Sequence, residues 1–160
     1  MEEKKEVLKL LSYAYRYLSY RMRTEKEMEL YLLEKTKLKN IAENFIPEAI
    51  QYLVETGYLN DSLFVEEYVL SRNKSKPKSK YVLSIELSQK GIKKEIIDSY
   101  FENNRLDEEK LAKQAVYRRW QLFRTLPQEI RFKKTSDFLR RRGFSFDIIK
   151  KTIEELESSE

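Results

Sequence analysis

The amino-acid sequence predicts an all-α protein made of three tandem three-helix repeats that form an elongated, curved helical array. The composition favours helices, because Leu, Ile, Glu, Lys and Arg are abundant while the 160 residues include only three glycines and three prolines. A repeat is indicated because one apolar pattern with helical spacing occurs three times, at intervals of about 50 residues. The three copies are Ala49, Ile50, Leu53 and Val54; Ile96, Ile97, Tyr100 and Phe101; and Ile148, Ile149, Thr152 and Ile153.

Each copy of the pattern follows a residue that tolerates a positive φ angle, as the left-handed cap of a helix requires. These residues are Asn44, Gly91 and Gly143. One local plan therefore occurs in triplicate: a helix, a left-handed cap, an apolar residue and a short amphipathic helix. Such small modules bury their apolar faces against their neighbours. We expect the three repeats to span residues 1–60, 61–104 and 105–160.

The first repeat begins with an amphipathic helix that we expect to end near Arg21. Thr24 and Glu27 have the spacing of a capping box and predict the start of a second helix. A third helix is predicted over Ile46–Glu55. Pro47 fits its first turn, where the missing N–H group is not needed.

The second repeat is expected to open with Asp61 as the N-cap of the fourth helix. The cation-rich segment Arg72–Lys80 is predicted to be a basic loop. A fifth helix should start near Pro77 and reach Lys90, and a sixth should cover about 93–102.

The third repeat should begin with a seventh helix capped by Asp107. Thr125 and Gln128 have a second capping-box spacing and predict an eighth helix that ends at Gly143. Ser145 is the expected cap of the ninth helix. The loops between repeats are short, so the repeats should stack on one another.

The composition argues against an enzyme. The chain has no cysteine and no histidine, which removes disulfides, thiolate metal sites and the commonest general base. The three glycines lie far apart, so no glycine-rich phosphate loop exists. A magnesium site made only of carboxylates is compatible with the spacing, but nothing in the sequence indicates one. We expect no cofactor, no metal and, without a long apolar run or a signal peptide, no membrane and a cytoplasmic location.

The distribution of charge gives the strongest functional signal. The formal net charge is only +5, yet residues 72–94 contain eight cations against one anion, and residues 118–142 contain nine cations against two anions. These two windows occupy corresponding parts of the second and third repeats, so stacking would align them as a basic stripe for nucleic acid or an acidic protein surface. The candidate contact residues are Arg72, Lys74, Lys76, Lys78, Lys80, Arg118, Arg119, Arg131, Lys134, Arg140, Arg141 and Arg142.

Simpler interpretations of the same residues remain open. A run of cations is often only the solvated face of a helix. Trp120, Phe123 and Phe132 could stack on bases, but their helical spacing favours the core for each of them.

Several segments, in matching order, resemble sequences typical of the bacterial regulatory protein RecX family. They are Leu18–Glu27, Gly57–Arg72, Leu87–Ile92 and Phe138–Ile149. The resemblance covers nearly the whole chain and implies a fold of three tandem three-helix units. The chain departs from the family in the first repeat, which residues 35–42 make longer and in which Asn44 stands where glycine is usual.

The resemblance also implies a function that composition alone does not indicate. Members of the family bind the RecA recombinase, lie in the groove of the RecA–DNA filament and restrain ATP hydrolysis and strand exchange, and many bind DNA directly. The expected role is therefore RecA regulation in homologous recombination, DNA repair and the SOS response, by a monomer with weak, sequence-independent DNA binding. A general DNA-binding or architectural protein is the alternative, and a carboxylate-dependent nuclease is disfavoured by the absence of its motifs.

Overall fold

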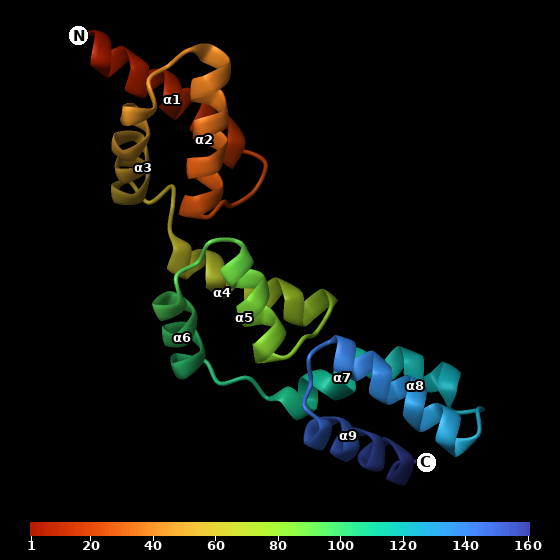
Figure 1. The fold of residues 1–160 in the computed structure, drawn as a ribbon. Helices are drawn as coiled ribbons and strands as arrows, with labels where there is room; N and C mark the ends of the chain where they lie inside the picture. The colour runs from red at the N-terminus through yellow and green to blue at the C-terminus, as the bar shows by residue number, and fades with distance from the viewer. The chain divides into compact units, whose positions relative to one another are not determined.

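The computed structural model describes residues 1–160 and contains nine α-helices, one 3-10 helix and no strand (Figure 1), which confirms the all-α tandem-repeat prediction. The elements are α1 (Glu2–Leu18), α2 (Glu25–Lys39), η1 (Glu43–Phe45), α3 (Ile46–Glu55), α4 (Asp61–Ser75), α5 (Lys80–Gln89), α6 (Lys94–Asn103), α7 (Glu108–Phe123), α8 (Gln128–Arg141) and α9 (Phe146–Ser158).

The chain divides into two units. Unit 1 comprises Met1–Glu66 and Leu87–Asp98, and unit 2 comprises Glu67–Glu86 and Ser99–Glu160. The division crosses α4, α5 and α6, so each of these helices contributes residues to both units.

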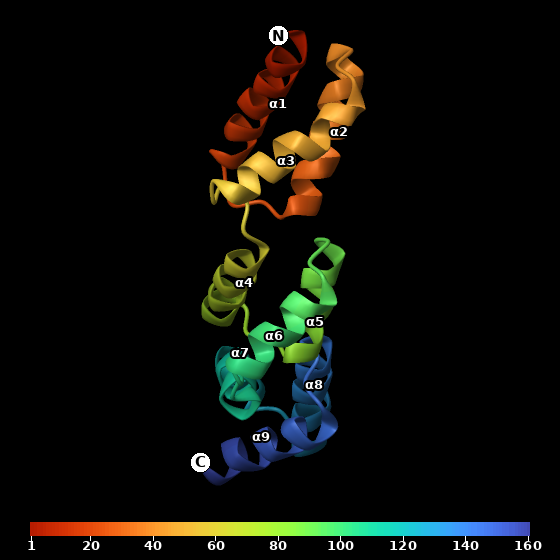
Figure 2. The same cartoon turned by 90° about the vertical axis from the view of Figure 1, so that its left-hand side faces the viewer.

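Unit 1 is built on the trio α1, α2 and α3, in which each helix packs on the other two (Figure 2). Its core is almost entirely aliphatic, and burial of these side chains is the main force that holds the trio together. The buried residues are Val7, Leu10, Leu11, Ala14, Met28, Leu32, Ile41, Ile46, Ala49, Leu53 and Leu59.

The predicted capping box at the start of α2 is confirmed. The Thr24 hydroxyl accepts a hydrogen bond from the Glu27 N–H (3.0 Å), and the Glu27 carboxylate accepts one from the Thr24 N–H (2.9 Å). The predicted left-handed cap at Asn44 is wrong. The residue with positive φ is Asn40 (φ 53°), and Asn44 lies in the 3-10 helix that follows it.

This 3-10 turn separates the cap from α3 and shifts the apolar register of the first repeat. Ala49 and Leu53 are fully buried, whereas Val54 is 40% exposed. In the third repeat, the buried pair is Ile149 and Ile153, each one position later than a fixed repeat spacing predicts from Ala49 and Leu53. The repeats share one plan, but Ala49 lies nine residues after its cap Asn40, whereas Ile149 lies six residues after Gly143, so this connection is three residues longer in the first repeat.

Unit 2 contains the trio α7, α8 and α9, and again each helix packs on the other two (Figure 1). Asp107 and Ser145 cap α7 and α9 as predicted, through hydrogen bonds from the N–H groups of Lys110 (3.1 Å) and Ile148 (3.3 Å). The core residues are Leu111, Ala112, Val116, Trp120, Phe138, Leu139, Phe144, Ile149 and Ile153.

Three predicted helix starts differ from the structure. Asn60, and not Asp61, caps α4, because its side chain accepts from the Leu63 N–H (3.0 Å). Helix α8 has Pro127 at its N-cap and no side-chain cap, so the capping box predicted at Thr125 does not form. The supposed basic loop is shorter than expected, since α4 continues to Ser75 and α5 starts only at Lys80.

A hydrogen-bonded junction in unit 1 explains what Asp61 does instead. The Thr24 hydroxyl donates to the carbonyl oxygen of Lys90 (2.7 Å), and the Glu25 N–H donates to the Asp61 carboxylate (2.9 Å). The start of α2 is thereby fixed both to the turn before α6 and to the first residue of α4. Gly91 in this turn has φ 81°, as predicted for a left-handed cap.

Unit 2 contains a corresponding junction at the start of α5. The Ser79 N–H donates to the carbonyl oxygen of Arg142 (3.0 Å), and the Lys80 N–H donates to the Glu108 carboxylate (2.8 Å). Gly143 has φ 86°, and a Cβ atom there would overlap with Val82 and Ser79. The residue must therefore be glycine for two reasons, its backbone angle and the close approach of α5. This junction sets the position of Arg142.

Candidate polyanion interface

A groove of about 620 Å³ in unit 2 brings together cations from three parts of the chain. Its walls are the end of α4 with the loop that follows, α7 between Lys110 and Arg118, and the C-cap residue of α8. No acidic side chain lines it. The lining residues are Lys74, Ser75, Pro77, Lys110, Lys113, Gln114, Ala115, Tyr117, Arg118 and Arg142. We call this the basic groove.

Hydrogen bonds to backbone carbonyl groups hold the walls of the basic groove together. The Gln114 side-chain amide donates to the carbonyl oxygen of Asn73 (3.2 Å), which joins α7 to the last turn of α4. The Arg142 Nη1 donates to the carbonyl oxygen of Pro77 (3.5 Å), in addition to the backbone bond at Ser79. The position of Arg142 is therefore set by the fold, whereas Lys74 and Arg118 are exposed side chains that can adjust to a ligand.

Arg142 lies close to a second guanidinium group. Arg142 is 5.0 Å and Arg119 is 4.6 Å from the ring centroid of Phe138, an arrangement typical of cation–π contacts. Burial lowers the pKa of Arg142 from its ordinary value, and the charge of Arg119 lowers it further. Neither arginine forms an ion pair within the chain. An anion bound here would relieve this repulsion between like charges.

Ion pairs divide the predicted stripe into neutralised and available cations. Within the chain, Lys78 pairs with Glu86, Arg140 pairs with Asp137, and Arg131 reaches the Glu157 carboxylate at 3.3 Å. Arg72 is half-buried and lies over the ring of Tyr68, 5.0 Å from its centroid. Apart from Arg72, the predicted residues that form no ion pair are Lys74, Lys76, Lys80, Arg118, Arg119, Lys134, Arg141 and Arg142. Of these, the basic groove unites Lys74, Arg118 and Arg142.

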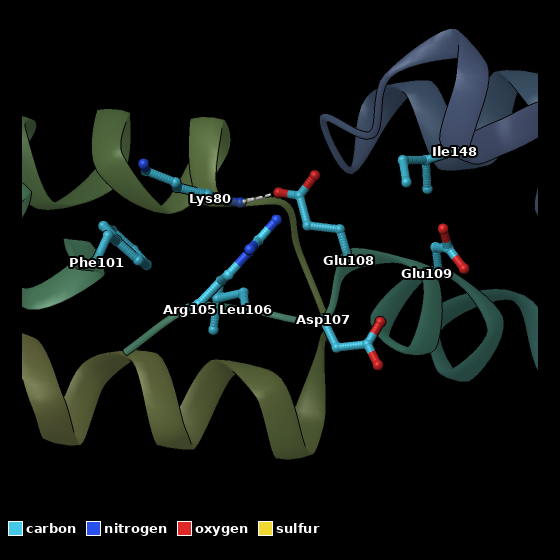
Figure 3. Close-up of a pocket in the computed structure, with 8 residues that line it drawn as sticks. All are labelled: Lys80, Phe101, Arg105, Leu106, Asp107, Glu108, Glu109 and Ile148. Carbon is cyan, nitrogen blue, oxygen red and sulfur yellow. Dashed lines mark hydrogen bonds between the residues drawn. The ribbon is translucent and has the colours of Figure 1, made fainter. Parts of the chain in front are cut away.

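Lys80 lines a different cavity of unit 2, of about 590 Å³, whose walls carry charges of both signs (Figure 3). Its backbone N–H is held by Glu108, while its side chain points away from that carboxylate, and Nζ lies 5.7 Å from the centroid of the Phe101 ring. Asp107 and Glu109 also line this cavity. The acidic lining makes it a poor site for a polyanion.

Two further cations line the groove, Lys110 and Lys113, which lie outside the two charge-rich windows of the sequence. Helical spacing could have revealed Lys110, because Lys110, Gln114 and Arg118 follow one another at intervals of four along α7 and share one face. Lys113 pairs with Glu155. The core position favoured for the aromatic residues is observed for Trp120, whereas Phe132 is 38% exposed.

The chemistry of the basic groove is that of an anion receptor. Guanidinium and ammonium groups bind phosphate and carboxylate oxygens by charge-assisted hydrogen bonds, and arginine can do so with two parallel bonds. Contacts of this kind fix position without reading a base sequence. None of the helices in the structure is long and apolar enough to cross a lipid bilayer.

Fold and groove together define an all-α tandem-repeat protein that carries a groove lined by cations. Three family models match the chain in order: RecX, first three-helix domain, over residues 11–53; RecX, second three-helix domain, over 60–100; and RecX, third three-helix domain, over 107–153. The chain belongs to the RecX family.

Individual relatives agree with this assignment. The regulatory protein RecX of Chlorobium limicola is 31% identical over 145 residues, which cover 91% of this chain and 87% of the relative. That of Bacillus cytotoxicus is 32% identical, and the match covers 94% of this chain but 55% of the relative. The chain thus spans about half the length of several relatives it matches. The crystal structure of RecX from Lactobacillus salivarius superposes with a TM-score of 0.79 at 28% identity, covering 96% of this chain and 98% of that one.

Proposed function

We propose that this chain regulates the RecA recombinase by binding the RecA–DNA filament in its groove and restraining ATP hydrolysis and strand exchange. The observation that carries the proposal is the match of all three RecX domains, in order, to the three repeats of this chain. A regulatory protein that binds a filament needs no catalytic residues of its own, and the composition, without cysteine or histidine, accords with that role.

The basic groove supplies a physical basis for the filament contact. Its cations lie in unit 2, which contains 19 lysines and arginines against 13 carboxylates, whereas unit 1 contains 13 against 14. A filament on DNA offers phosphates and acidic protein side chains, and unit 2 attracts both. Contacts to neighbouring RecA subunits would hinder the rearrangements that accompany each round of ATP turnover.

The test is the RecA ATPase on single-stranded DNA with increasing amounts of this protein. We expect inhibition well below one molecule per RecA subunit, on filaments that have already formed. The second candidate function, a general DNA-binding or architectural protein, is favoured by the basic groove alone. Such a protein would inhibit only at amounts that coat the DNA, and a large excess of DNA would abolish its effect. That result would replace the first proposal by the second.

A further inference from the structure

Unit 1 contains a groove of a different chemical character. Its volume is about 570 Å³, and it lies between the start of α2, one side of α3, the first residue of α4 and the turn before α6. Its apolar wall comes from α3, and its carboxylates come mainly from α2, α3 and α4. The lining residues are Glu25, Lys26, Glu29, Ile46, Pro47, Ile50, Gln51, Val54, Glu55, Asp61, Gly91 and Lys93. We call this the acidic-apolar groove.

The apolar wall exists because α3 has apolar residues on two faces. Ala49 and Leu53 fill the core of unit 1 and are fully buried. Pro47, Ile50 and Val54 lie three and four positions apart, so they form a stripe along the neighbouring face. Ile50 is half-buried and Val54 is 40% exposed. Ile50 also packs against the core of unit 1, so the stripe lies at the edge of that core.

Carboxylates surround the stripe at a cost in electrostatic energy. Burial raises the pKa of Glu25, and the charge of Asp61 raises it further; burial also raises the pKa of Asp61. Lys93 is the nearest cation that opposes both shifts. Of the other two carboxylates in the lining, Glu29 pairs with Lys26 at 2.9 Å.

The fourth carboxylate, Glu55, accepts a hydrogen bond from the Gln51 amide (2.8 Å) and has no cationic partner. The lining therefore contains four carboxylates against two lysines. These carboxylates are spread around the stripe and are not grouped as ligands of a metal ion. A cationic side chain entering the groove would find unneutralised negative charge beside an apolar surface.

We propose that the acidic-apolar groove binds a basic segment of the protein partner, with one aliphatic or aromatic side chain against Ile50 and Val54 and flanking lysines or arginines against the carboxylates. Charge complementarity selects this occupant, because a polyanion would be repelled here. The inference rests on the proposed function: the protein component of the filament occupies unit 1, while the basic groove of unit 2 takes the phosphates. An anchor of one or two side chains matches the size of the groove.

The test is a binding titration of fluorescently labelled protein with RecA filaments on single-stranded DNA, formed with a non-hydrolysable ATP analogue, and with the same DNA alone. Val54→Glu introduces a charge into the stripe at an exposed position, and Leu8→Glu is the matched control on α1, where Leu8 is 61% exposed and outside the groove. We expect Val54→Glu to weaken filament binding at least about tenfold and to leave binding to free DNA unchanged. Leu8→Glu should leave both unchanged.

A second variant, Glu29→Gln with Glu55→Gln, removes charge without altering the stripe and keeps the test valid if Val54→Glu fails to fold by circular dichroism. Filament binding by this variant should weaken, and the loss should shrink as salt is added. Wild-type affinity in both variants would overturn the inference and leave the proposed function standing. Failure of the wild-type protein to bind filaments would overturn both. Wild-type self-association that Val54→Glu abolishes would identify a second copy of the chain as the occupant and overturn the partner assignment.

Discussion

The basic groove makes a quantitative prediction for the double variant Lys74→Gln with Arg118→Gln. Both side chains are exposed and form no ion pair, so their neutralisation should change the free energy of unfolding by less than about 0.5 kcal/mol. Four cations of the groove form no ion pair, namely Lys74, Lys110, Arg118 and Arg142. If each contacts one phosphate of single-stranded DNA, the logarithm of affinity should fall with the logarithm of salt with a slope of about −2.8.

The double variant should retain a slope of about −1.4, since two of the four contacts are lost. Between about 50 and about 200 mM salt, wild-type affinity should fall about 50-fold and variant affinity about sevenfold. The assay is fluorescence anisotropy with labelled oligonucleotides at several salt concentrations. Lys37→Gln with Lys39→Gln is the matched control, because both lysines are exposed in unit 1 and lie outside either groove. An unchanged slope in the groove variant, or an equal loss in the control, would refute the reasoning.

Three further outcomes are expected. Gly143→Val should lower the free energy of unfolding by at least about 1–2 kcal/mol and so lower the midpoint of thermal unfolding. The shift should exceed that of Gly57→Ala, because a Cβ atom at Gly57 meets no neighbour. Equal shifts would contradict the packing argument. Burial opposes ionisation of Glu86, but hydrogen bonds from Lys78 and Tyr68 prevail and lower its pKa. Glu86→Gln should therefore destabilise the protein at pH 7. The difference in free energy of unfolding from wild type should narrow as pH falls below 4.5, the ordinary pKa of the group. A difference that does not depend on pH would be evidence against a stabilising role of the ionised carboxylate. Purified protein should hydrolyse neither ATP nor DNA by itself, and a hydrolysis lost on one carboxylate-to-amide change would disprove this.

Features set by local chemistry were predictable from the sequence. Thr24, Asp107 and Ser145 cap helices because a side chain and a backbone N–H three residues later meet whatever surrounds them. Gly91 and Gly143 adopt positive φ for an equally local reason. The two glycines belong to the pattern from which the repeat is predicted.

Features that depend on packing were not predictable. Asp61 has the sequence context of an N-cap, but the N–H of Glu25 competes for its carboxylate, and Asn60 caps the helix in its place. The 3-10 turn that contains Asn44 lengthens the connection between the cap and α3, whereas a count at fixed spacing assumes that this connection has constant length.

Charge counting found the sign of the candidate site and three of its members, Lys74, Arg118 and Arg142, but not the rest. Lys78 belongs to the predicted stripe, yet the fold pairs it with Glu86, eight positions along the chain. Lys110 lies in the basic groove but outside both charge windows, in a segment where Glu108 and Glu109 precede it. A sequence window counts the charges of consecutive residues, whereas a ligand contacts charges that the fold brings together on one surface. Helical spacing along α7 recovers Lys110, but pairing across helices requires the structure.

The two grooves together suggest why a regulator of this kind would have several repeats. A surface that binds only phosphates follows DNA wherever it is, and a surface that binds only a basic segment follows the partner protein whether or not it is on DNA. If both grooves bind, the second contact is made at the high local concentration that the first provides, so the chain prefers the assembled filament to either component. The preference should therefore disappear when either groove is disabled. The Val54→Glu and Lys74→Gln/Arg118→Gln variants should each lower filament affinity. In the combined variant, the loss of binding free energy should be at least the sum of the losses in the two separate variants.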